Sequence, residues 1–215
     1  PGTTTLEYDG SSWTSGGALP SGGNFMVNNA AGTQTAGLRA GGGPGATTTV
    51  QKYDGSSWTS ANSMSVARIG NYFDGAQTAA ITTAGEAPSA PDASGSQTKL
   101  TEEFDGTNWT SGAASIYYLQ SGATSGGASA PTAWMIAGGD GPNVTNNTGI
   151  TQEYNGTAFS YSAFLSTPRR QISGGGTQAA GLVMGGTEAS SSSLNATEEY
   201  TGSVTAVSAS TLTTS

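Results

Sequence analysis

The apolar residues of this chain are sparse, and where they cluster they alternate with polar residues. Leu6 and Tyr8 are separated by Glu7, which is the spacing of two side chains on one face of a β-strand. Threonine-rich runs such as residues 47–49 suit a pleated, half-exposed strand. No segment shows a convincing 3.6-residue apolar stripe, so the pattern predicts an all-β protein with almost no helix.

A short turn motif returns along the chain: an aromatic residue, Asp or Asn, Gly, and a second aromatic three residues after the glycine. Asx-Gly pairs between β-rich runs favour tight hairpin turns, because glycine tolerates positive φ and the Asx side chain hydrogen-bonds its own turn. The copies are carried by Tyr8, Gly10 and Trp13; Tyr53, Gly55 and Trp58; Phe104, Gly106 and Trp109; Tyr154, Gly156 and Phe159; and, without the second aromatic, Tyr200 and Gly202. The glycines therefore recur every 45–51 residues.

A second motif, rich in glycine, threonine and alanine, lies between successive turns. Its copies span residues 32–42, 75–85, 129–139 and 176–186. They end in pairs of small residues: Gly41 and Gly42, Ala84 and Gly85, Gly138 and Gly139, and Gly185 and Gly186. The two motifs predict four strands in each repeat. Strand a is expected over residues 25–27, 69–73, 117–119 and 170–172. Strand b ends at the small pair, strand c ends at the Asx-Gly turn, and strand d carries the second aromatic.

In motif order and in a period near fifty residues, these repeats resemble the kelch repeat. The resemblance covers residues 3–215 and implies a β-propeller, with four-stranded blades around a central channel. It further implies that the small pairs let neighbouring blades approach closely and that the aromatics of strands c and d pack between blades. We expect one domain, 1–215, with units at about 1–20 (a half blade), 21–66, 67–115, 116–167 and 168–215.

The counts of predicted strands are unequal, with five c–d pairs and four a–b pairs. The sequence therefore predicts about five blade positions with an incomplete N-terminal blade. We expect residues 3–13 to form that incomplete blade beside the last unit, 169–215. An unpaired strand edge invites pairing with other chains, so self-association through the incomplete blade is a further expectation.

Composition limits the chemistry. Gly contributes 34 of the 215 residues, which suits thin sheets packed through small side chains. The net charge is −8 with six Lys and Arg, so the chain lacks the basic patch that nucleic-acid binding needs. With no His and no Cys, Cys/His zinc sites, Ser–His or Cys–His nucleophiles and disulfides are excluded. We expect no catalytic residues, no cofactor and no metal, and interpret the 140–147 loop as a turn, not a calcium site.

Five aromatic residues are not tied to the repeated positions of the motifs and are the candidate binding residues: Tyr117, Tyr118, Trp134, Tyr161 and Phe164. Aromatic rings with few charges nearby suit stacking against sugars, and they equally suit packing between blades. Both interpretations remain open for each residue at this point.

The Thr/Ser/Gly-rich character of the repeats is similar to arrays in bacteriophage virion proteins, such as fibre or tail-associated proteins, and in bacterial surface proteins. That similarity implies a non-enzymatic structural or binding module on a virion or cell surface. Its partner would be a receptor, a glycan or a neighbouring structural protein, with no nucleic acid and no membrane insertion. The alternatives are a free lectin-like carbohydrate-binding propeller and a fragment of a propeller-type enzyme with its active residues elsewhere.

Overall fold

The computed structural model describes residues 2–20, 30–43, 45–142, 147–190 and 192–202. In these ranges the chain is β-structure joined by turns, and the helical structure is one 3-10 turn, η1 (Gly127–Ser129). The all-β prediction is confirmed. No helix of the described ranges has the length and apolarity to cross a membrane.

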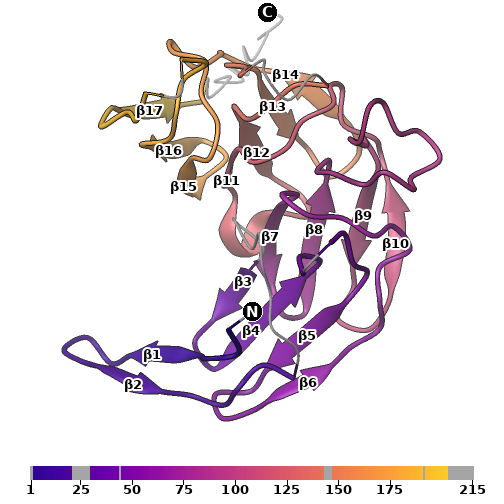
Figure 1. The fold of residues 1–215 in the computed structure, drawn as a ribbon, viewed down its shortest axis with the longest axis vertical. Helices are drawn as coiled ribbons and strands as arrows, with labels where there is room; N and C mark the ends of the chain where they lie inside the picture. Colours follow the sequence, from indigo (N-terminus) through magenta and orange to yellow (C-terminus); the bar gives the residue numbers. More distant parts are fainter. Residues whose placement is uncertain (1, 21–29, 44, 143–146, 191, 203–215) are drawn as a thin grey trace, which may run out of the picture.

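Five antiparallel sheets follow one another along the chain (Figure 1). The N-terminal hairpin consists of β1 (Leu6–Tyr8) and β2 (Trp13–Ser15). Blade 1 consists of β3 (Ala30–Thr33), β4 (Ala36–Ala40), β5 (Val50–Tyr53) and β6 (Trp58–Ser60). Blade 2 consists of β7 (Tyr72–Ala76), β8 (Ala79–Thr83), β9 (Thr101–Phe104) and β10 (Trp109–Gly112).

Blade 3 consists of β11 (Ala123–Ser125), β12 (Trp134–Ala137), β13 (Thr151–Tyr154) and β14 (Phe159–Tyr161). Blade 4 has three strands in the described residues, β15 (Ser173–Thr177), β16 (Ala180–Met184) and β17 (Thr197–Thr201). Within each blade the strands pair in chain order, with the first strand innermost.

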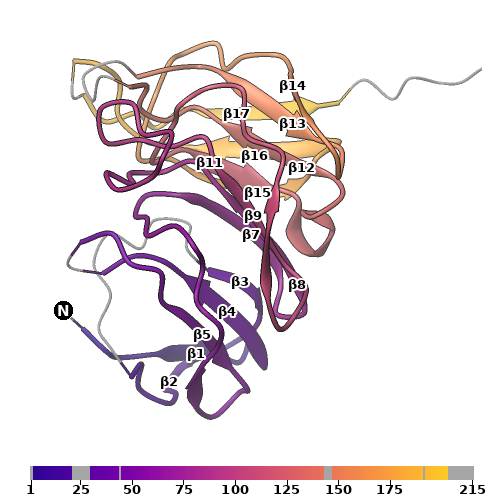
Figure 2. The same ribbon diagram turned by 90° about the vertical axis from the view of Figure 1, so that its right-hand side faces the viewer.

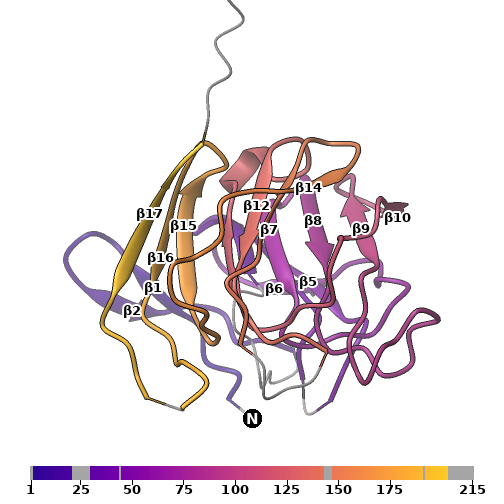
Figure 3. The ribbon, with the colours of Figure 1, turned by 90° about the horizontal axis from the view of Figure 1, so that it is seen from above.

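The blades fan around one axis, on which their inner strands converge. One cavity there is lined by residues from the first strand of all four blades: Ala30, Phe73, Asp74, Thr124, Gly174, Gly175 and Gly176. The hairpin lies at one end of the series and blade 4 at the other, as Figure 1 shows; seen from above in Figure 3, the two overlap on the left. Figure 2 shows blade 1 and the hairpin on one side of blade 2, and blades 3 and 4 on the other. The described residues form a β-propeller of four blades, with the two-stranded N-terminal hairpin packed on blade 1 as an incomplete unit; the predicted fold class is confirmed.

The Asx-Gly turns form where the motif predicts them. Gly10, Gly55, Gly106 and Gly156 have φ between 88° and 99°. In the second copy, Asp54 Oδ1 accepts hydrogen bonds from the backbone N–H groups of Ser56 and Ser57, both at 2.8 Å. The carboxylate thus satisfies two donors that the tight turn leaves without a strand partner.

The prediction for strand a was wrong in position. Strands β7, β11 and β15 begin three to six residues later than expected, and residues 25–27 lie outside the described ranges. Space near the axis explains the shift, because a Cβ on Gly174 would lie 2.7 Å from the carbonyl oxygen of Thr124. In blade 4 the inner strand needs a small residue there, whereas the equivalent position of β7 holds the buried Phe73. The larger Leu119 and Ile172 are buried in the turns that precede β11 and β15. The copies at 32–42, 75–85 and 176–186 therefore span the end of strand a, the a–b turn and strand b, whereas the copy at 129–139 begins after β11, at the end of η1.

The small pairs at the ends of strand b do allow close approach. A Cβ on Gly139 would lie 2.3 Å from the carbonyl oxygen of Gln120, and one on Gly41 would lie 2.8 Å from that of Arg68. The Gly41 contact is made to the turn that leads into the next blade, and the Gly139 contact to the turn that leads into its own blade. Ala84, which replaces glycine in one pair, also has a positive φ, of 58°.

Aromatic pairs from strands c and d lie between blades. We call the face of a blade toward the preceding unit its upstream face, and the opposite face its downstream face. On the upstream face of blade 1, the Tyr53 and Trp58 rings stack with centroids 4.9 Å apart. The Trp58 indole donates a hydrogen bond to Thr5 Oγ1 at 2.9 Å, and that of Trp109 donates to Asn62 O at 3.0 Å.

The resemblance implied that the strand d tryptophans pack between blades, and the structure shows that they do so only in part. Trp58 and Trp109 are half-buried, because their indoles lie at the rim of the interface with the preceding unit. Trp13 is 66% exposed, because no blade covers the upstream face of the hairpin in the described residues. The prediction that residues 3–13 lie beside the last unit was wrong: the hairpin packs on blade 1, to which Tyr53 and Trp58 hydrogen-bond it, and lies apart from blade 4 (Figure 1).

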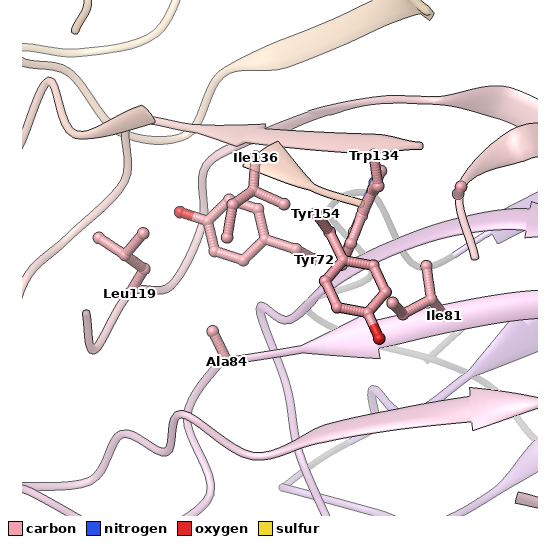
Figure 4. Close-up of a cluster of buried hydrophobic side chains, with 8 residues drawn as sticks. Tyr72, Ile81, Ala84, Leu119, Trp134, Ile136 and Tyr154 are labelled. Carbon is pink, nitrogen blue, oxygen red and sulfur yellow. The ribbon is translucent and has the colours of Figure 1, made fainter. Parts of the chain in front are cut away.

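The largest buried cluster joins blades 2 and 3 (Figure 4). Trp134, from β12, is its largest member and has no exposed surface. The corresponding positions of blades 1, 2 and 4 hold the small residues Gly37, Ala80 and Gly181, as the strand registers show. Blade 3 therefore places one buried indole where the other blades have glycine or alanine.

Candidate binding surfaces

The five candidate aromatics do not form one site. Trp134 is fully buried in the cluster of blades 2 and 3, so it packs and offers no face to a surface ligand. Tyr117 is partly buried against the same cluster. The hydroxyl of Tyr118 donates to Asp92 O at 3.0 Å, and Lys99 Nζ lies 5.0 Å from its ring centroid.

Tyr161 and Phe164 are the two candidates that the structure brings together at the surface. Tyr161 is 51% exposed and Phe164 is 57% exposed. Their ring centroids are 5.9 Å apart and their planes meet at 73°, an edge-to-face arrangement. This geometry holds one ring against the edge of the other and leaves ring faces open to solvent.

These two positions depart from the repeat. The strand registers place Tyr161 opposite Gln152, in the position that serine occupies in the other units, at residues 15, 60 and 111. Counted from the strand d aromatic, Phe164 corresponds to Ala18, Ser63 and Ala114. Since the other blades form with small residues here, the fold does not require an aromatic pair at this rim.

A narrow crevice of about 90 Å³ adjoins Phe164 at the junction of blades 3 and 4. Its lining includes Val183, Glu198 and Glu199. Burial pushes the pKa of Glu198 upward, but hydrogen bonds from Ser166 and the charge of Arg169 outweigh burial and hold this pKa below its ordinary value. The rim thus combines exposed rings with an ionised carboxylate, a hydrogen-bond acceptor.

A second, polar cavity of about 250 Å³ opens where the blade-to-blade turns meet near the axis. It is lined by Ile69, Gly70, Glu86, Gln120, Ser121, Asp140, Arg170 and Gln171. Three of these occupy equivalent turn positions with positive φ: Gly70 at 58°, Ser121 at 59° and Gln171 at 53°. Such conformations are costly for Ser and Gln, and surrounding contacts maintain them.

Opposite charges meet in this cavity. Arg170 Nη1 lies 3.4 Å from each carboxylate oxygen of Asp140. Burial raises the pKa of Asp140, and the Arg170 charge opposes that shift. Sequence reasoning missed this cavity. The sequence feature that could have revealed the cavity is the acidic residue directly after a small pair: Glu86 follows Ala84 and Gly85, and Asp140 follows Gly138 and Gly139.

The repeated aspartates have a structural role. The pKa values of Asp9, Asp54 and Asp105 all lie below the ordinary value because backbone N–H groups of their own turns donate to them. Each carboxylate is engaged within its own turn. In the described residues, no three Asp or Glu side chains gather as a metal site would require.

No family model matches this chain, and no curated protein matches it. The fold defines its class as a β-propeller, and the kelch-like character is a resemblance carried by its motifs.

Proposed function

We propose that this propeller is a non-enzymatic binding module displayed on a virion or cell surface, and that it contacts a surface glycan through the rim of Tyr161 and Phe164. The observation that carries the proposal is that pair: two aromatic rings, each more than half exposed, where the other units have serine or alanine. A large exposed apolar side chain that the fold does not need favours a role in binding.

The chemistry of the rim suits a saccharide. The apolar face of a sugar ring stacks on an aromatic ring, and its hydroxyl groups need acceptors and donors at the edge of that contact. The Glu198 carboxylate lines the crevice, and the Tyr161 hydroxyl is itself both donor and acceptor. Display on a virion or cell surface is supported by the Thr/Ser/Gly-rich similarity noted above.

A glycan array compares residues 1–215 with the variant Y161S/F164S, which restores the small polar residues that blade 1 has at Ser60 and Ser63. We expect the wild-type chain to bind a limited set of glycans and the variant to lose that binding while keeping its β circular dichroism. The matched control is Trp13→Ser, which removes another exposed aromatic side chain, in the N-terminal hairpin. Equal binding by Y161S/F164S would place the glycan contact elsewhere, and equal loss in the control would indicate nonspecific adhesion.

A further inference from the structure

The junction of blades 3 and 4 lacks the large rings that fill the two junctions before it. Phe73 of β7 is buried between blades 1 and 2, and Trp134 of β12 is buried between blades 2 and 3. The strand registers place Gly174 where blade 2 has Phe73, and Gly181 where blade 3 has Trp134. Neither glycine can fill space as those rings do, and the crevice of about 90 Å³ beside Phe164 lies at this junction.

Much of the crevice wall is apolar. Blade 3 contributes Met135 and Ala137 from β12 and Leu165 from the segment after β14, and blade 4 contributes Val183 from β16. Met135, Ala137 and Val183 are buried core residues. Packed side chains of this kind hold a fixed shape, so the wall favours a group that is at least partly apolar.

One polar atom in this wall has no partner. Thr151, on β13, lines the crevice and is 1% exposed. Its Oγ1 is buried without a hydrogen-bond partner in the described residues. A buried hydroxyl in this state is costly, and most such groups in folded proteins are satisfied by protein, water or ligand. The crevice therefore presents one hydrogen-bonding group to whatever enters it.

The neighbouring blades show why this hydroxyl lacks a partner. In blade 2, Thr83 and Thr101 lie opposite each other on strands b and c, and their hydroxyl oxygens are hydrogen-bonded at 2.7 Å. In blade 1 the same positions hold alanine and valine, which have no hydroxyl. Blade 3 has Ala137 opposite Thr151, so the threonine keeps its hydroxyl but faces a methyl group. The fold does not require a hydroxyl here, since blade 1 forms without one.

The volume of the crevice limits the size of the group that it can hold. An apolar cavity of about 150 Å³ holds benzene, with its ring of carbon atoms. By proportion, about 90 Å³ holds roughly three or four non-hydrogen atoms. An acetyl group has this size, whereas a whole sugar ring with its substituents is too large to enter.

The charges around the crevice favour a neutral ligand. Glu198 accepts a hydrogen bond from Ser166 N at 2.7 Å and is paired with the buried Arg169. Glu153, on the facing strand of blade 3, accepts the hydroxyl of Tyr200. A ligand carboxylate would be repelled by these two carboxylates, and a ligand ammonium would lose its hydration against the apolar wall.

We propose that this crevice is the specificity pocket of the glycan rim and receives the acetamido group of a neutral N-acetylhexosamine. The sugar ring stacks on Phe164 at the mouth of the crevice. The methyl group lies against Met135 and Val183, and the carbonyl oxygen accepts a hydrogen bond from Thr151 Oγ1. The inference rests on the proposed glycan binding and adds which saccharides the rim prefers.

Two disaccharides test the preference, because N,N′-diacetylchitobiose and cellobiose share one linkage and differ in the acetamido groups. In isothermal titration calorimetry with residues 1–215, we expect the chitobiose to bind at least about tenfold more tightly, since it adds methyl burial and one hydrogen bond. Equal affinities, both lost in Y161S/F164S, would overturn this inference and leave the glycan rim standing. Absence of binding by either disaccharide would also overturn it, while the glycan array decides the proposed function.

Thr151→Val tests the hydroxyl with little change of shape, because blade 1 has Val50 at this position. The variant should lower the affinity for the chitobiose about three- to tenfold and leave that for cellobiose unchanged. Its urea midpoint should not fall, because the hydroxyl has no partner within the described protein. Unchanged affinity for the chitobiose would overturn the inference.

The matched control is Thr101→Val in blade 2. It leaves the buried hydroxyl of Thr83 without the partner that it has at 2.7 Å, so its urea midpoint should fall. Its affinity for the chitobiose should equal that of wild type, since Thr101 lies at another junction. A loss of affinity as large as in Thr151→Val would show that the effect is not specific to the crevice, which also overturns the inference.

Discussion

The ammonium group of Lys52 lies 5.3 Å from the centroid of the Phe104 ring, at the junction of blades 1 and 2. The corresponding positions at the other junctions hold Glu and Tyr, joined by a hydrogen bond. The replacement of a Glu–Tyr pair by a Lys–Phe pair has a chemical reason. Phe has no hydroxyl to donate, and its ring face carries partial negative charge that attracts a cation. Lys52 also donates to Gly106 O at 2.6 Å, which ties it to the turn of the next blade.

Changing Lys52 to Glu should destabilise the fold by about 1 kcal/mol, because a carboxylate would face the ring and the bond to Gly106 would be lost. The double variant K52E/F104Y should recover most of that loss by rebuilding the Glu–Tyr pair. Urea unfolding of both single variants and the double variant gives the coupling energy. Additive effects would show that the two positions do not interact.

The buried ion pair of blade 2 should tolerate joint replacement better than loss of one partner. Arg68 Nη2 lies 2.8 Å from Glu102 Oε2, and their side chains are 0% and 3% exposed. Glu102→Gln should cost about 3–5 kcal/mol, because it leaves a buried guanidinium without its counter-charge.

Blade 3 supplies the matched comparison, because Leu119 and Gln152 occupy the same two positions there. Gln152 Oε1 still accepts the backbone N–H of Ile116, at 2.6 Å, as Glu102 accepts that of Ser65. The double variant R68L/E102Q should therefore be more stable than E102Q alone in urea unfolding. A double variant less stable than the single one would contradict this account.

Trp134 should matter more to stability than the repeat tryptophan Trp58. Trp134→Ala removes a fully buried indole and should cost about 3–5 kcal/mol. Trp58→Ala removes a half-buried ring and one hydrogen bond, so about 1–2 kcal/mol is expected. Thermal unfolding of the two variants gives the order, and a larger loss for Trp58 would refute the assignment of the core.

The Asx-Gly turns should make stability fall in acid. Hydrogen bonds from the Ser57 backbone and the Ser56 side chain lower the pKa of Asp54 from 3.8 to about 2. Because the folded value is the lower one, the contribution is complete above the unfolded pKa and is lost as pH falls toward about 2.

Asp54→Asn tests this directly, since Asn155 makes the same turn with a neutral acceptor at 2.9 Å from two backbone nitrogens. The urea midpoint of D54N should fall less than that of wild type between about pH 6 and about pH 2.5. Asp54→Ala, which removes the acceptor, should be less stable than D54N at both pH values. An identical pH dependence in wild type and D54N would exclude the turn as its source.

Two parts of the fold follow from local sequence. The Asx-Gly pair at Asp54 and Gly55 specifies a turn by the conformations and hydrogen bonds of four adjacent residues, so the motif places strands c and d correctly. The count of such turns also predicts the half blade at the N-terminus, because each turn needs its own pair of strands.

The candidate sites were only partly predictable. Tyr161 and Phe164 could be selected because they depart from the repeat, and the sequence selected Trp134 for the same reason. Local sequence cannot distinguish a ring that fills a gap between blades from a ring at the rim, because the difference lies in which residues of the neighbouring blade reach it. The polar cavity around Asp140 and Arg170 was missed because its lining residues, such as Glu86 and Asp140, come from separate repeats.

The sequence by itself determined the repeat period, the hairpin turns, the all-β class and the unequal number of outer and inner strands. Each of these depends on short motifs of residues that are adjacent along the chain. The tertiary structure decided where strand a begins, which tryptophan is buried and which polar side chains meet at the axis. These depend on the space left where strands about fifty residues apart converge, and backbone such as Gly174 against Thr124 sets that space by direct contact.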